Sequence, residues 1–328
     1  MLRIFTRRTA VTTGASLPVL LSLAGACVFL VIGSLVSSIF AQQTVAGLAQ
    51  GAIFGSLALA LVLIYRATEV INFAQGELAM ATTYIAYQLT VWGLSYWLAF
   101  FLTLPIAFVL GVAIQVVLIR PVQHSVIAVV IVTVGLFILI DGVVTWIWGA
   151  DLKFMKAPFG NAVYHAGSVA FARQDIGVLL VTILTVVLLW LLFQFTKLGL
   201  AMRAAALRPA AASLVGVRVN AMLAIGWGLA AALGAVAGLM TEPSQFLQPT
   251  MMQAILLYSF SAAVLGGLES PVGAVVGGLA IGVFLNLVGQ YVGFATSELR
   301  LPIAFAVLLI VLLIKPNGLF GRRQVRRV

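Results

Sequence analysis

The sequence predicts an all-α, polytopic membrane protein with about ten transmembrane helices and both termini in the cytoplasm. Three observations support this fold class: 63% of the 328 residues are hydrophobic, only 8% are charged, and long apolar runs recur throughout the chain. A helix needs about 20 residues to cross a hydrocarbon core, in which the backbone has no hydrogen-bond partner except itself. A soluble domain of this length would need a more strongly charged surface.

The apolar runs define ten expected spans, at residues 17–40, 47–65, 70–90, 97–119, 126–148, 177–196, 222–240, 254–268, 272–292 and 301–315. Residues 1–16 and 316–328 are then cytoplasmic tails, and 17–315 form a single transmembrane domain. Spans 254–268 and 301–315 are short for a crossing, and the first could instead be re-entrant. A re-entrant segment would place the basic tail 316–328 outside, which favours a true span.

The basic residues follow the same topology. A net charge of +10 is compatible with nucleic-acid binding, but only four of the 18 Lys and Arg residues fall in the predicted outer segments. The other 14 fall in inner segments, as the positive-inside rule requires. The charge is therefore interpreted as a topology signal.

The first span, 17–40, has a second interpretation as a cleaved signal peptide, because Arg7 and Arg8 precede it and small residues occur near Ala41. Its apolar run is long for a signal peptide, and Ile39 fits a cleavage site poorly. A retained span is therefore preferred.

Glycines recur at every fourth residue on two expected spans, at Gly47, Gly51 and Gly55 and at Gly273 and Gly277. Such spacing lets helix backbones approach closely in lipid. The glycines indicate helix packing, either within one subunit or at a subunit interface or moving seam.

Recognisable catalytic motifs are missing from the sequence. It contains no Walker-type phosphate loop, no His, Cys and carboxylate cluster with metal-ligand spacing, and no hydrolase triad. Its single cysteine excludes an intramolecular disulfide. We expect a protein that is not an enzyme and holds no metal or cofactor.

Polar residues within the apolar spans are the strongest functional signal. Asn72, Gln75, Gly76 and Glu77 occur together in the third span, and Asp141 lies in the fifth. A charged residue at a helix centre costs about 2.5–3.5 kcal/mol, so it usually faces a cavity or a partner. These five residues are predicted to line a translocation pathway or gate. A structural or gating role and direct contact with substrate both stay open.

The inner loop 197–221 is rich in alanine and poor in charge, and Pro209 is placed to open a second short helix. A helix with a small apolar face suits a groove of a cytoplasmic partner. The alternative is an amphipathic helix that rests on the membrane surface.

Several of these segments together resemble the LivH-type permease subunits of branched-chain amino acid ABC importers, and the resemblance covers residues 45–323. The residues that carry it are Gly47 to Ile53, Asn72 to Glu77, Arg203-Ala204 with Gly216, Leu265-Gly266-Gly267, Gly273-Ala274, Gly277-Gly278 and Lys315 to Gly321.

The resemblance implies a permease of a bacterial-type inner membrane with several partners: a second related permease subunit, two cytoplasmic ATPases that use ATP, and an extracytoplasmic binding protein. The loop 197–221, with Arg203, Ala204, Arg208, Pro209 and Gly216, matches the segment that docks into the ATPase. The sequence departs from the family pattern at Gln75, where His is common. It also has Leu207-Arg208 where an acidic or amide residue is usual.

The sequence therefore predicts the permease subunit of an ABC importer for branched-chain amino acids. A permease for urea or short amides in the same family is one alternative. An ion-coupled secondary transporter, with the buried carboxylates as proton or sodium sites, is the other.

Overall fold

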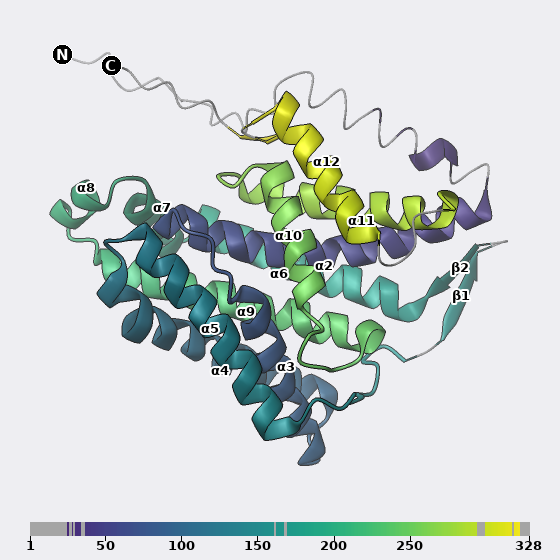
Figure 1. Cartoon of the computed structure of the whole chain (residues 1–328), viewed down its shortest axis with the longest axis horizontal. Helices are drawn as coiled ribbons and strands as arrows, with labels where there is room; N and C mark the ends of the chain where they lie inside the picture. The colour runs from purple at the N-terminus through teal and green to yellow at the C-terminus, as the bar shows by residue number, and fades with distance from the viewer. Residues whose placement is uncertain are drawn as a thin grey trace.

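The computed structural model describes residues 37–160, 162–166, 169–293, 299–316 and 318–321, with 25, 28 and 30–33. Helices form 79% of these described residues. The α-helices labelled in Figure 1 are α2 (Ser38–Thr68), α3 (Gln75–Val91), α4 (Tyr96–Ile114), α5 (Val126–Trp148), α6 (Arg173–Phe195), α7 (Lys197–Leu207), α8 (Pro209–Leu214), α9 (Val219–Gln245), α10 (Gln253–Gly266), α11 (Pro271–Tyr291) and α12 (Arg300–Ile314). A π-helical turn, Gln115–Ile119, and a 3-10 turn, Arg120–Val122, extend α4.

Six helices of the described part are long and apolar enough to cross a membrane: α2, α4, α5, α6, α9 and α11. The apolar helices α10 and α12 are shorter. The expected count of about ten spans is therefore not confirmed, and most of the expected span 17–40 lies outside the described residues.

Helix ends correct the predicted spans in two places. Helix α2 begins at Ser38 and runs without a break through the expected outer loop before residue 47. The Ser37 side chain caps it, and the Thr44 hydroxyl donates to Phe40 O at 2.8 Å, so its polar residues are accommodated within the helix. The expected span at 70–90 begins as a helix only at Gln75, after a loop that starts at Glu69.

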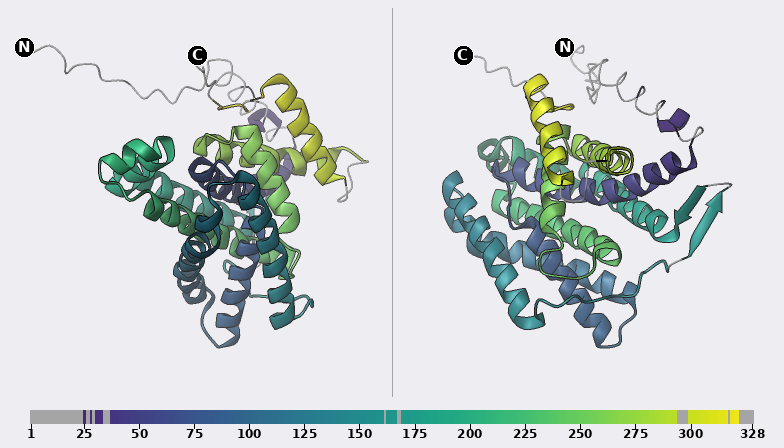
Figure 2. Two further views of the ribbon diagram at one scale, coloured as in Figure 1. Left: turned by 60° about the vertical axis from the view of Figure 1, so that its left-hand side comes forward. Right: turned by 45° about the vertical axis from the view of Figure 1, so that its right-hand side comes forward.

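The protein is mostly helical, as predicted, but a two-stranded hairpin that was not expected lies between α5 and α6. Strand β1 (Val163–Ala166) pairs antiparallel with β2 (Val169–Ala172), with Val163 opposite Ala172. Valine and aromatic residues favour the strands, but four residues were too few to mark them within an expected loop. The hairpin projects beyond the helices, beside the beginning of α2 (Figure 2).

Helix α2 lies at the centre of the molecule and packs along α11 (Figure 1). Its glycines sit directly against the α11 backbone: a Cβ added at Gly51 would lie 2.7 Å from Gly278 O, and one at Gly55 would lie 3.1 Å from Val275 O. A Cβ added at Gly47 would likewise lie 2.6 Å from Val283 Cα. This glycine stripe therefore serves a contact within the chain.

Gly273 and Gly277 lie on a different face of α11. A Cβ on either would collide with backbone carbonyl groups of α10, those of Gly266 and Ala262. Helix α11 thus approaches α2 with one set of glycines and α10 with another, which ties three helices together.

Replacing Gly51 with valine should destabilise the protein by about 1–3 kcal/mol or more, because the obstructing atoms are backbone and the helices must separate. The measurement is the thermal unfolding midpoint of the purified protein in detergent. Gly135→Val is the matched control, since an added Cβ there meets no described atom within 4 Å. Equal midpoints for the two variants would contradict this account of the seam.

Candidate functional site

The polar run begins in the turn that joins α2 to α3. Glu69 ends α2 in a left-handed conformation (φ 57°), and its N–H donates to Tyr65 O at 2.7 Å. The buried Asn72 side chain then orders the turn: its Oδ1 accepts from Ala74 N, and its Nδ2 donates to Gln75 Oε1, both at 3.1 Å. An asparagine here supplies the hydrogen bonds that the turn backbone lacks.

Gln75 connects this turn to α9. Its Nε2 donates to Ala230 O at 2.8 Å, and its side chain is fully buried. Gly234 makes room for it, because a Cβ on Gly234 would lie 2.9 Å from the same nitrogen. On the other side, a Cβ added at Gly76 would lie 3.1 Å from Leu256 Cβ in α10. The start of α3 is therefore wedged between α9 and α10.

Glu77 is fully buried and incompletely hydrogen-bonded. Its Oε1 is 3.5 Å from the Gln253 Nε2 donor, and its Oε2 has no partner within the described chain. Asp141 on α5 lies close enough for the two carboxylates to interact electrostatically, and its Oδ1 is likewise buried without a described partner. The structure thus brings together Glu77 and Asp141, which are far apart in the sequence.

The contact between α3 and α5 continues beyond the carboxylates. Tyr84, two turns after Glu77, is buried and within electrostatic reach of Asp141. Its ring lies 5.4 Å from that of Trp148, whose Nε1 donates to Gln88 Oε1 at 2.9 Å. We call Glu77, Tyr84, Asp141 and Gln253 the polar seam. The sequence reasoning missed Tyr84 and Gln253, although Tyr84 shares the helix face of Glu77 by its i+7 spacing.

One further buried carboxylate, that of Glu242, was not singled out from the sequence. Glu242 lies just after the predicted end of a span at 240, but α9 continues to Gln245 and leaves its side chain only 1% exposed. Pro243 has no N–H for Leu239 O, and the Tyr96 hydroxyl donates to that carbonyl instead, at 2.9 Å. A tyrosine from α4 therefore compensates for the proline and lets the helix extend.

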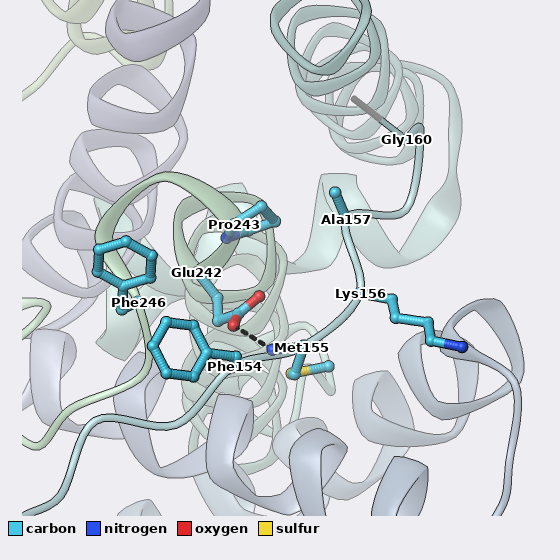
Figure 3. Close-up of a pocket in the computed structure, with 8 residues that line it drawn as sticks. All are labelled: Phe154, Met155, Lys156, Ala157, Gly160, Glu242, Pro243 and Phe246. Carbon is cyan, nitrogen blue, oxygen red and sulfur yellow. Dashed lines mark hydrogen bonds between the residues drawn. The ribbon is translucent and has the colours of Figure 1, made fainter. Parts of the chain in front are cut away.

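The segment after α5 crosses over this end of α9, and the two together line an open pocket of about 390 Å³ (Figure 3). Lys153 and Leu247 pair as an antiparallel bridge, with N···O distances of 2.9 and 3.0 Å. Met155 N then donates to Glu242 Oε1 at 2.7 Å. The lining residues are Phe154, Met155, Lys156, Ala157, Gly160, Glu242, Pro243 and Phe246.

The expected docking segment, 197–221, forms two short helices at the end of the molecule far from the hairpin (Figure 1). The Thr196 hydroxyl caps α7 by accepting from Gly199 N at 3.0 Å, Pro209 opens α8, and Gly216 (φ 85°) follows it. Arg203 Nε donates back to Gly199 O at 3.4 Å, while Ala204 is half-buried and Arg208 is exposed.

Three apolar side chains of this segment are largely exposed: Leu207 (73%), Leu214 (88%) and Val215 (79%). We call them the apolar tip. The opposite side of α7 packs through Met202 and Ala205, which are buried. No three His, Cys, Asp or Glu residues of the described ranges lie together as a metal site would require.

Comparison with known proteins gives a consistent result. The family model described as "Branched-chain amino acid transport system / permease component" matches residues 43–312. The high-affinity branched-chain amino acid transport system permease protein LivH of Salmonella typhimurium is 29% identical, covering 88% of this chain and 98% of its own. A probable LivH of Methanocaldococcus jannaschii is 31% identical over 81% of this chain and 87% of its own.

One further relative and one solved structure are also similar to this chain. BraD of Pseudomonas aeruginosa, also named a high-affinity branched-chain amino acid transport system permease protein, is 29% identical over 88% of this chain and 98% of its own. PsaBC from Streptococcus pneumoniae in complex with Fab gives a TM-score of 0.48 at 15% identity, covering 89% of this chain and 97% of that one. That score does not establish a shared fold.

Gln75→Leu should destabilise the protein by about 1–3 kcal/mol, because it leaves Ala230 O and Asn72 Nδ2 short of a buried partner. Chemical denaturation of the purified protein measures the loss. Gln43→Leu is the control, since it removes a similar amide contact, Gln43 Nε2 to Gln290 Oε1 at 3.2 Å, that is exposed. A smaller loss for Gln75→Leu than for Gln43→Leu would show that the buried connection to α9 is unimportant.

Proposed function

Because this chain belongs to the family of branched-chain amino acid transport permease components, we propose that it is the membrane-spanning subunit of an ABC importer. Its substrates are branched-chain amino acids, which it carries inward across a bacterial-type inner membrane. The match over residues 43–312 is the observation that carries this proposal. The names of the relatives supply the substrate class.

Its partners are a second related permease subunit, two cytoplasmic ATPases and an extracytoplasmic binding protein. The apolar tip supports an ATPase contact, because Leu207, Leu214 and Val215 expose apolar area next to basic residues that favour the cytoplasmic side. In this arrangement the ATPases bind and hydrolyse ATP, and this subunit catalyses no covalent step.

Coupling to the membrane part follows from the contacts of α9. Helix α7 packs against α6 and α9, and α9 packs against α3. Gln75 precedes Glu77 by two residues, and its side-chain amide donates a hydrogen bond to Ala230 O in the middle of α9. A shift of α7 and α8 on ATP binding is therefore transmitted through α9 to the polar seam. In the polar seam, Glu77 of α3 and Asp141 of α5 act as gate or pathway residues.

An ion-coupled secondary transporter is the second candidate, favoured by the nearness of Glu77 and Asp141. Two buried carboxylates in electrostatic contact suit a proton or sodium ion. This candidate gives the exposed apolar tip no role. Within the ABC proposal, urea or short amides are the alternative substrates.

Leucine uptake is expected to depend on ATP. The tagged chain is purified from its source membranes with the subunits that accompany it, reconstituted into liposomes, and supplied with labelled leucine and the binding protein. Uptake should require hydrolysable ATP on the side of the liposome membrane that the ATPases face, and it should persist when an ionophore removes ion gradients. Uptake driven by a gradient without ATP would establish the secondary transporter, and uptake of urea but not leucine would establish the alternative substrate.

Leu214→Asp should abolish co-purification of the ATPases and ATP-dependent uptake, because it places a charge in the apolar tip. The fold of the chain should not be affected, since Leu214 is 88% exposed and packs little against the protein. Amounts of the chain in the membrane should not change. Asn220→Asp, an exposed position at the start of α9, adds the same charge outside the apolar tip and should retain both. Retained ATPase binding by Leu214→Asp would remove the apolar tip from the interface.

A further inference from the structure

The pocket at the end of α9 has no part in the coupling route described above. It lies between the segment 153–160 and the last turn of α9, and it contains one carboxylate among mostly apolar side chains (Figure 3). Its volume of about 390 Å³ falls in the range of small-molecule sites. The predicted topology puts Lys153 and Lys156 outside, so the pocket faces the side from which a binding protein delivers substrate.

Glu242 presents an unused hydrogen-bond acceptor in this pocket. Its Oε1 accepts from Met155 N, but its Oε2 is buried and finds no donor in the described part of the chain. The Tyr96 hydroxyl lies within electrostatic reach of Glu242 but donates to Leu239 O. Lys156 is exposed, and its ammonium group points away from the carboxylate (Figure 3).

A buried carboxylate oxygen without a donor is costly, so a cationic ligand would relieve it. A divalent metal ion is a poor fit, because hard cations take six or more oxygen ligands and the lining supplies one carboxylate. An ammonium group supplies its own N–H donors and needs only a nearby acceptor. The rings of Phe154 and Phe246, whose centroids are 5.1 Å apart, add apolar and π surface that suits an ammonium bearing an aliphatic group.

We propose that this pocket is a receiving site for amino acids, in which Glu242 Oε2 accepts a hydrogen bond from the substrate ammonium and Phe154 and Phe246 contact its aliphatic side chain. The identification of the ligand as an amino acid rests on the proposed function. The ammonium site itself rests on the geometry at Glu242.

The test uses protection of an introduced thiol and needs no transport. The only cysteine, Cys27, is replaced by serine, and Ala157→Cys places a thiol in the pocket lining. The rate of maleimide labelling of the purified complex in lipid nanodiscs is measured with leucine, 3-methylbutylamine, which lacks the carboxylate, 4-methylpentanoate, which lacks the ammonium, or sodium chloride alone. Leucine and 3-methylbutylamine should slow labelling, whereas 4-methylpentanoate and sodium chloride should not.

Glu242→Gln, which keeps an acceptor for Met155 N, should raise the leucine concentration for half-protection by about tenfold or more, as loss of a charge-assisted hydrogen bond predicts. Glu69→Gln removes an exposed carboxylate elsewhere and should leave protection unchanged. Phe154→Ala should also weaken protection by leucine, and it gives an independent measurement if Glu242→Gln fails to fold.

Equal protection by 4-methylpentanoate, protection by sodium chloride alone, or unchanged protection in Glu242→Gln would overturn the site. No protection by leucine would do the same, even if ATP-dependent leucine uptake is observed, so the proposed function survives that result. Protection by 3-methylbutylamine and leucine without leucine uptake would instead retain the ammonium site and reject the proposed function.

Discussion

Close backbone approach at glycine is the constraint on which the rest of this structure depends. In lipid, apolar side chains gain little by facing one another, so helices associate through packing and hydrogen bonds. Helix α2 meets α11 at Gly51 and Gly55, where no side chain separates the backbones. The same device recurs at Gly111, where a Cβ would lie 2.5 Å from Trp227 O and which brings α4 against α9.

That packing also decides where polar groups are held. Gly234 on α9 leaves the space that Gln75 occupies, and the bond from Gln75 Nε2 to Ala230 O then fixes the first turn of α3. Fixing this turn places Glu77 inward, two turns before Tyr84 and beside Asp141. The position of this buried carboxyl group therefore follows from a missing side chain on a neighbouring helix, and its Oε2 is left without a partner among the described residues.

Sequence reasoning located most helices, and it singled out Glu77 and Asp141, because a charge within an apolar run is visible without coordinates. It placed neither residue beside Gln253 or Tyr84, since those pairings depend on how α3, α5 and α10 cross. Glu242 was missed for a local reason: a proline at 243 normally indicates a helix end. Only the Tyr96 hydroxyl, distant in sequence, shows why the helix continues there. The continuation of α2 through the Gln42-Gln43-Thr44 run was hidden in the same way, because polar residues resemble a loop until their hydrogen bonds are known.

Helix α9 relates the three regions to one another. The α7–α8 pair precedes its start, Ala230 at its middle accepts from Gln75, and Glu242 near its end lines the pocket. Its 27 residues span about 40 Å at 1.5 Å per residue, which is longer than a hydrocarbon core. Helix α9 is continuous from Val219 to Gln245 and packs against α4 through Gly111. A single helix therefore connects the segment that carries the apolar tip, the turn that precedes Glu77 and the pocket.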